Sequence, residues 1–144
     1  MKNKITEKQK DLLIQCALSA RSFAYAPYSG FAVGAAVLGD DGNIYTGCNI
    51  ENASYGAANC AERTAVFNAV SRGVRSIQAA AIAGGEHGTD INEVCFPCGI
   101  CRQVLSEFCG SQTPVLLAGK SGSVSEYTLE ELLPHAFNLK QTQK

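Results

Sequence analysis

The amino-acid sequence predicts a three-layer α/β/α sandwich in which helices cover both faces of a mixed, roughly five-stranded sheet. Predicted helices alternate with predicted strands along the chain, which is typical of this fold class. Residues 77–83 form a largely apolar run, as expected of a strand that is covered on both faces. The 144 residues, 46% hydrophobic and 17% charged, suit one globular domain, which we expect to span residues 1–144.

The first elements are expected to be a helix and a hairpin. Thr6 is placed to cap a helix that runs to about residue 23. The apolar stripe of that helix consists of Leu12, Leu13, Cys16, Ala17 and Ala20. A turn-rich loop at 25–30 precedes a buried strand at 31–38. The turn sequence at 40–43 then predicts a hairpin whose returning strand is 44–50.

A polar segment at 51–59 divides the hairpin from the rest of the chain and predicts a functional loop. A helix is expected at 60–72, because its apolar residues recur on one face and Gly73 stands where such helices end. The remaining expected elements are a strand at 77–83, a loop at 84–93, a helix at 98–108, strands at 115–118 and 124–127, and a short helix at 129–133.

Charge and cysteine content exclude several classes of protein. The formal net charge is −1, with no clustered basic face, so we expect no nucleic-acid partner. No apolar run reaches about 18 residues and the N-terminus is polar, so we expect no membrane partner and a cytoplasmic location. Seven cysteines, an odd number, in a reducing compartment do not predict a disulfide framework.

The cysteines instead predict a metal site. Cys60 begins one predicted helix, and Cys98 and Cys101 begin another, in the sequence Pro-Cys-Gly-Ile-Cys. A helix N-terminus favours the thiolate, which is the form that binds metal. Three protein ligands are typical of catalytic zinc, which keeps a fourth position open. Cys95 is the most serious candidate for a fourth ligand, but the stiff Phe96-Pro97 spacer disfavours it.

Glu62 favours a catalytic over a structural zinc site. It lies two residues after Cys60, on the same first turn, so its carboxylate can reach the open position of the metal. Zinc lowers the pKa of bound water to about 7. A neighbouring carboxylate can then take a proton from that water and deliver it to a ring nitrogen and a leaving amine. A Cys-Ala-Glu segment followed by Pro-Cys-x-x-Cys is the signature of zinc nucleobase deaminases.

With these residues, the sequence resembles the homotetrameric cytidine deaminase family of the cytidine/deoxycytidylate deaminase superfamily. The resemblance is carried by YxPYSxFxVGAA at 25–36, GCNIENASY at 47–55, CAERTA at 60–65, PCGxCRQV at 97–104 and ELLPxAF at 131–137. It implies zinc-dependent hydrolysis of cytidine and 2′-deoxycytidine to uridine and 2′-deoxyuridine plus ammonia, in pyrimidine salvage. It also implies one zinc ion per subunit and a homotetramer with shared active sites.

The resemblance implies roles for individual residues. Cys60, Cys98 and Cys101 bind zinc, and Glu62 moves the proton. The implied substrate contacts are Phe31 for the pyrimidine, Asn49 and Glu51 for the ribose 3′-hydroxyl, Ala53 and Tyr55 from a neighbouring subunit near the 5′-hydroxyl, and Phe137 from another subunit, stacked on the base. Arg63 is expected to hydrogen-bond to the sulfurs, because three thiolates leave Zn²⁺ with a formal net charge of about −1.

Two departures from the family pattern stand out. Ile100 occupies a position where alanine is common and is expected to alter the packing behind the zinc, and residues 84–96 exceed the length usual in compact relatives.

Four other functions are each compatible with part of the sequence. A deaminase of a cytosine-bearing aminonucleoside antibiotic such as blasticidin S shares both cysteine motifs, but the segment 49–53 favours a plain nucleoside. A polynucleotide-editing deaminase is disfavoured by the acidic balance and short chain. A non-catalytic zinc module would require a fourth ligand, and a redox Cys-x-x-Cys would leave Cys60 and Glu62 unexplained.

Overall fold

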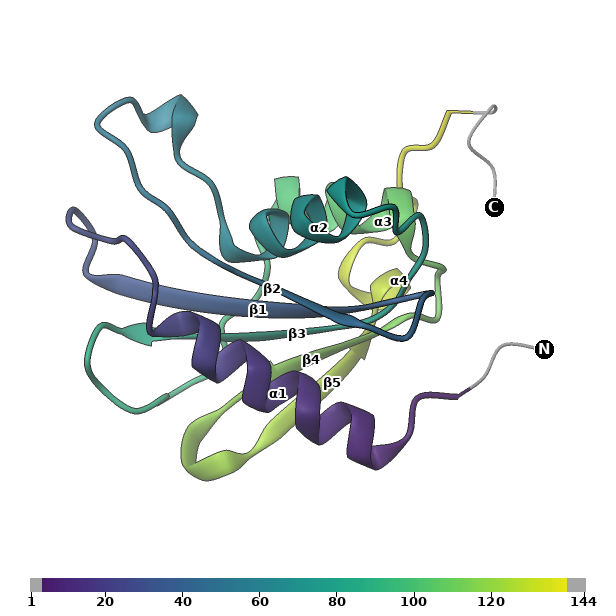
Figure 1. Cartoon of the computed structure of the whole chain (residues 1–144), viewed down its shortest axis with the longest axis horizontal. Helices are drawn as coiled ribbons and strands as arrows, with labels where there is room; N and C mark the ends of the chain where they lie inside the picture. Colours follow the sequence, from purple (N-terminus) through teal and green to yellow (C-terminus); the bar gives the residue numbers. More distant parts are fainter. Residues whose placement is uncertain (1–3, 140–144) are drawn as a thin grey trace.

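The computed structural model describes residues 4–139 and places a five-stranded sheet between two layers of helices (Figure 1), as the sequence predicts. In chain order the elements are α1 (Glu7–Arg21), β1 (Phe31–Gly39), β2 (Ile44–Cys48), a 3₁₀ turn (Tyr55–Ala57), α2 (Ala61–Ser71), β3 (Ile77–Glu86), α3 (Gly99–Phe108), β4 (Pro114–Ala118), a second 3₁₀ turn (Lys120–Gly122), β5 (Val124–Thr128) and α4 (Leu129–Leu132).

The sheet is mixed, with the strand order β2-β1-β3-β4-β5. Strand β1 pairs antiparallel with both β2 and β3, β3 pairs parallel with β4, and β4 pairs antiparallel with β5. Because β3 lies at the centre, all of its residues are buried except Gln78 and Glu86. The apolar character of this segment therefore reflects coverage by helices on both faces.

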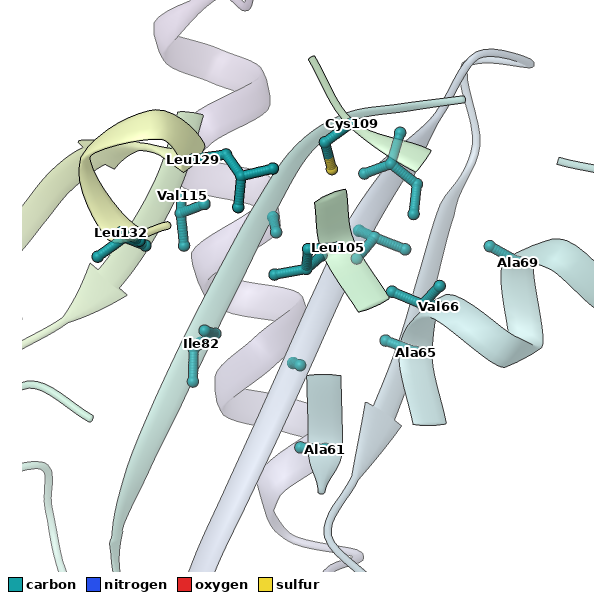
Figure 2. Packing of buried hydrophobic residues seen from close by; sticks show 14 of the residues in the cluster. Ala61, Ala65, Val66, Ala69, Ile82, Leu105, Cys109, Val115, Leu129 and Leu132 are labelled. Carbon is teal, nitrogen blue, oxygen red and sulfur yellow. The ribbon is translucent and has the colours of Figure 1, made fainter. Parts of the chain in front are cut away.

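Helix α1 covers one face of the sheet, and α2, α3 and α4 cover the other (Figure 1). On the α1 face the buried residues include Leu13, Ile14, Ala17, Ala36, Leu38, Ala79 and Ala81. On the opposite face, Figure 2 shows Ala61, Ala65, Val66 and Ala69 of α2 packed with Ile82, Leu105, Val115 and Leu129. The small alanine side chains, together with Gly47 of β2, let α2 approach the sheet closely.

Helix α1 is held against the sheet by a close approach and by one arginine. A Cβ atom at Gly34 of β1 would lie 2.0 Å from the backbone oxygen of Ala17, so only glycine permits this contact. Arg21, at the C-terminal end of α1, donates hydrogen bonds to three carbonyl oxygens, those of Ala32, Glu86 and Thr89, at 3.0, 2.6 and 2.8 Å. These bonds join α1 to β1 and to the end of β3.

The observed starts of α1, α2 and α3 agree closely with those predicted from the sequence. Thr6 caps α1 through a reciprocal pair of hydrogen bonds with Gln9, which satisfies two free backbone donors. Cys60 and Cys98 occupy the N-cap positions of α2 and α3, each with extended backbone angles. Both thiols are therefore presented at helix N-termini, where the free N–H groups favour a negative charge.

Two expectations were wrong. Leu12 is 52% exposed rather than part of the buried stripe of α1, because the helix faces the sheet with Leu13, Ile14 and Ala17. Leu12 instead lines a cavity of about 590 Å³ between α1 and β2. In addition, β3 continues to Glu86 although a loop was expected from residue 84, because Gly84 and Gly85 still pair with β1.

No helix within residues 4–139 has the length and apolar character needed to cross a membrane.

Candidate active site

Three cysteines meet where α2 and α3 begin. The sulfur atoms of Cys60, Cys98 and Cys101 all lie within 4.8 Å of one another, and those of Cys60 and Cys98 are 3.8 Å apart. A tetrahedral zinc ion with Zn–S bonds of about 2.3 Å holds its sulfurs about 3.8 Å apart. The spacing and the soft donor set therefore fit one zinc ion per subunit.

Cys95 lies outside this group of three sulfurs. Among the residues that the structure describes, no fourth cysteine, histidine or acidic side chain joins the three sulfurs. The Cys95 sulfur instead lies against β3, where a Cβ atom on Gly84 would come within 2.8 Å of it. Burial raises the pKa of the Cys95 thiol to about 11, which disfavours the thiolate that a metal requires.

Neighbouring groups stabilise negative charge on the sulfur of Cys60. A hydrogen bond from Cys101 and the guanidinium of Arg63 lower the pKa of Cys60 to about 5, whereas the same bond to Cys60 raises the pKa of Cys101. The Arg63 Nη2 atom donates to the Cys60 sulfur at 3.3 Å. A cation in this position offsets the negative charge of the thiolates, as expected for Arg63.

Arg63→Ala is expected to weaken zinc affinity by about 10- to 100-fold, because it removes a donor to a sulfur ligand. Zinc retained after dialysis against chelators of graded strength measures this effect. Arg72→Ala is the matched control, since the Arg72 Nε atom donates to Asn68 within the same helix at 3.1 Å. An Arg63 variant with unchanged zinc content and unchanged turnover would contradict this role.

Glu62 lies in the first turn of α2 and is only 6% exposed. Burial raises the pKa of its carboxyl to about 7, and the nearby charge of Cys60 acts in the same direction. A carboxyl group with a pKa near 7 can both accept and donate a proton at neutral pH. The structure thus places a buried carboxyl group with a pKa near neutrality beside the thiols of Cys60 and Cys101.

Asn49 lies beside the N-terminal end of β1. The side-chain amide of Asn49 forms the two hydrogen bonds that a backbone peptide group of a neighbouring strand would form with β1. Its Oδ1 accepts from Val33 N and its Nδ2 donates to Phe31 O, both at 2.8 Å. One Nδ2 hydrogen remains available to a ligand. The Phe31 ring is 43% exposed.

Glu51 follows β2, and its side chain lies against the turn at 25–30 that leads into β1. One carboxylate oxygen of Glu51 accepts hydrogen bonds from the backbone N–H groups of Tyr28 and Ser29, at 2.9 and 3.1 Å. The other accepts from the Ser29 hydroxyl. These hydrogen bonds, above all that from the hydroxyl, hold the pKa of Glu51 below its usual value. The structure therefore brings Phe31, Asn49 and Glu51 together at this end of β1.

The remaining predicted contacts lie on exposed segments. Ala53 and Tyr55 belong to the loop that projects beyond the sheet in Figure 1, and Tyr55 is 85% exposed. Phe137 is 68% exposed, and its backbone oxygen accepts a hydrogen bond from Gln103 of α3 at 3.1 Å. Ile100 is also 62% exposed, so within a single subunit its side chain projects from the start of α3 rather than packing into the core.

Sequence reasoning missed Ser29 as a partner of Glu51. The only signal for this contact was that Ser29 lies in the first block of residues that carries the family resemblance, two residues before Phe31. Contact between side chains 22 residues apart depends on how the turn and the loop meet, which the local pattern does not define.

Together the fold and the site define a zinc-dependent deaminase. Three thiols lie at two helix N-termini, and the buried Glu62 carboxyl lies on the first turn of α2. Residues 7–117 match the family described as the cytidine and deoxycytidylate deaminase zinc-binding region. This match covers more than half of the chain, and the protein belongs to that family.

Curated relatives and solved structures agree with this assignment. The chain is 52% identical to a cytidine deaminase of Sporosarcina psychrophila, over 88% of this chain and 89% of the relative. It is 46% identical to a cytidine deaminase of Mycobacterium tuberculosis, over 85% of each. The crystal structure of a cytidine deaminase from Burkholderia pseudomallei, 44% identical, superposes with a TM-score of 0.80 over 92% of this chain and 100% of that one.

Proposed function

We propose that this protein is a cytidine deaminase, which hydrolyses cytidine and 2′-deoxycytidine to uridine and 2′-deoxyuridine with release of ammonia. The observation that carries the proposal is the buried Glu62 carboxyl beside the three-cysteine group. The relatives of 46–52% identity, which are themselves cytidine deaminases, support the choice of substrate.

The metal and Glu62 have separate roles in the proposed reaction. Cys60, Cys98 and Cys101 would hold the zinc ion, which would supply an activated water nucleophile near neutral pH. Glu62 accepts a proton from the water that attacks C4 of cytosine and delivers it to N3. Glu62 then takes the proton of the new C4 hydroxyl and passes it to the exocyclic amine, which leaves as ammonia when the C4–N bond breaks and the C4 carbonyl forms. The raised pKa of Glu62 suits it to both directions of transfer.

Asn49, Glu51 and Phe31 form the proposed nucleoside pocket. The second Nδ2 hydrogen of Asn49 donates to the sugar 3′-hydroxyl, and the Glu51 carboxylate accepts the proton of that hydroxyl. The exposed Phe31 ring, at the start of β1, contacts the pyrimidine. The backbone bonds that hold Asn49 and Glu51 in the protein keep both groups in place before substrate arrives.

The same proposal includes a homotetramer with shared active sites, in which a neighbouring subunit supplies Ala53 and Tyr55 and another supplies Phe137. The exposure of large aromatic side chains supports it, because exposed apolar surface marks interaction sites. We further propose that the chain is one domain, acts in the cytoplasm and serves pyrimidine salvage.

A panel of cytosine compounds tests the substrate class. Zinc-loaded protein is incubated with cytidine, 2′-deoxycytidine, blasticidin S and a single-stranded oligodeoxycytidylate, and loss of cytosine absorbance is followed. We expect turnover of both nucleosides, with kcat/KM at least about 10²-fold lower for the other two compounds. Turnover of blasticidin S without cytidine would contradict the proposal and indicate an antibiotic deaminase.

A further inference from the structure

Ser29 links the proposed sugar-binding carboxylate to strand β1. The Ser29 hydroxyl donates to the Glu51 Oε2 atom and accepts a hydrogen bond from the backbone N–H of Phe31 at 3.0 Å. The turn that carries Ser29 is closed by a hydrogen bond from Gly30 N to Ala26 O at 3.0 Å. One side chain therefore connects Glu51 with the residue that begins β1.

The direction of these hydrogen bonds is determined by the groups involved. A backbone N–H can only donate, so the Ser29 oxygen accepts from Phe31, and the single hydroxyl proton is left for Glu51. A carboxylate can only accept, which agrees with this direction. The Ser29 hydroxyl is thus the donor that fixes Glu51 Oε2, whereas Oε1 is held by the backbone N–H groups of Tyr28 and Ser29.

Glu51 needs such a partner because it follows β2 in a loop rather than lying within a helix or strand. A free glutamate side chain samples many rotamers, and ordering it when substrate binds costs conformational entropy. With Oε2 fixed by Ser29, the carboxylate is oriented before the nucleoside arrives. Preorganisation of this kind raises affinity without adding a contact to the ligand.

We propose that Ser29 is a positioning residue for Glu51, and that it sets how strongly the enzyme prefers nucleosides bearing a 3′-hydroxyl over those lacking it. The inference rests on the proposed function and on the role of Glu51 within it. Ser29 itself need not touch the substrate. Its effect passes through the carboxylate, so it depends on whether the substrate carries the hydroxyl that Glu51 binds.

The variant Ser29→Ala removes the donor to Glu51 Oε2 and the acceptor of the Phe31 N–H, while both backbone donors to Oε1 remain. Comparing substrates with and without the 3′-hydroxyl separates these two losses. Ser29→Thr keeps a hydroxyl and is expected to restore the wild-type behaviour. Ser22→Ala is the matched control, since the Ser22 hydroxyl donates only to the Ser19 carbonyl oxygen at the end of α1, at 2.7 Å. Circular dichroism and thermal unfolding verify that each variant is folded.

The experiment compares 2′-deoxycytidine with 2′,3′-dideoxycytidine, which differ only in the 3′-hydroxyl. For Ser29→Ala we expect kcat/KM on 2′-deoxycytidine to fall about tenfold, mainly through KM, because a hydrogen bond to a charged group is lost. On the dideoxynucleoside the fall is expected to be less than about twofold. Ser29→Thr and Ser22→Ala should retain the wild-type ratio of the two values.

Each other outcome overturns a defined part of the account. Equal losses on both nucleosides, or no loss on either, overturn the positioning role of Ser29 and leave the proposed function standing. A wild-type enzyme that turns over both nucleosides equally well overturns the sugar-binding role of Glu51 and the inference with it. Failure of zinc-loaded wild type to deaminate 2′-deoxycytidine and cytidine overturns the proposed function itself.

Discussion

Glu62→Gln is expected to lower kcat by about 10²–10⁴-fold while zinc remains bound. Glutamine has nearly the same shape as glutamate, but its amide cannot take a proton from water and pass it to N3 or to the leaving amine. Glu62 is 6% exposed, and no other carboxylate of the described residues joins the three sulfurs, so no second acid is placed to replace it.

The measurement combines steady-state turnover of cytidine with metal analysis of the same preparation. Glu93→Gln serves as the control, because Glu93 is an exposed acid in the loop before α3. A Glu62→Gln protein that retains zinc and more than about a tenth of wild-type kcat would remove Glu62 from the proton-transfer role. A variant that instead loses its zinc would indicate that Glu62 acts mainly in metal binding.

Cys101→Ala is expected to abolish zinc binding and, with it, detectable deamination. Cys101 is completely buried and supplies one of the three sulfurs, so its loss leaves two ligands where catalytic zinc normally has three. The fold is expected to survive, because the apolar residues on both faces of the sheet pack independently of the sulfur group.

Zinc content per subunit, circular dichroism and turnover together measure this prediction. Cys109→Ala is the matched control, since Cys109 is a buried thiol at the other end of α3 and lies outside the metal-binding group. It should retain one zinc ion per subunit. A Cys101→Ala protein with full zinc content would contradict the assigned ligand set, and one that unfolds together with metal-stripped wild type would indicate a structural zinc site.

Much of the fold was predictable because its signals are local. The Thr6 capping box, the Asp-Asp-Gly-Asn turn at 40–43 and the apolar run of β3 each specify their own segment. Leu12 could not be placed in this way, since the face that α1 turns to the sheet depends on the contact between Ala17 and Gly34. The extension of β3 through Gly84 and Gly85 likewise depends on pairing with β1, which outweighs the usual preference of glycine for loops.

In the candidate site, too, the local features were predictable from the sequence, and the contacts between distant segments were not, except where a shared metal implied them. Two residues separate Cys98 from Cys101, and one separates Cys60 from Glu62, so their chemistry is visible in the sequence. The meeting of the two cysteine segments, 38 residues apart, followed from the metal that they share rather than from either segment alone. The contact of Ser29 with Glu51 had no such guide, because it depends on how a turn and a loop meet in space.

The most direct test of the central claim is product formation by zinc-loaded wild-type protein incubated with cytidine. Chromatography measures uridine, and an enzymatic assay measures ammonia in the same samples. We expect uridine and ammonia to appear in equal amounts as cytidine disappears, with activity lost on removal of zinc and restored when zinc is returned. Zinc-loaded, folded protein that leaves cytidine unchanged would contradict the claim that this site is a cytidine deaminase.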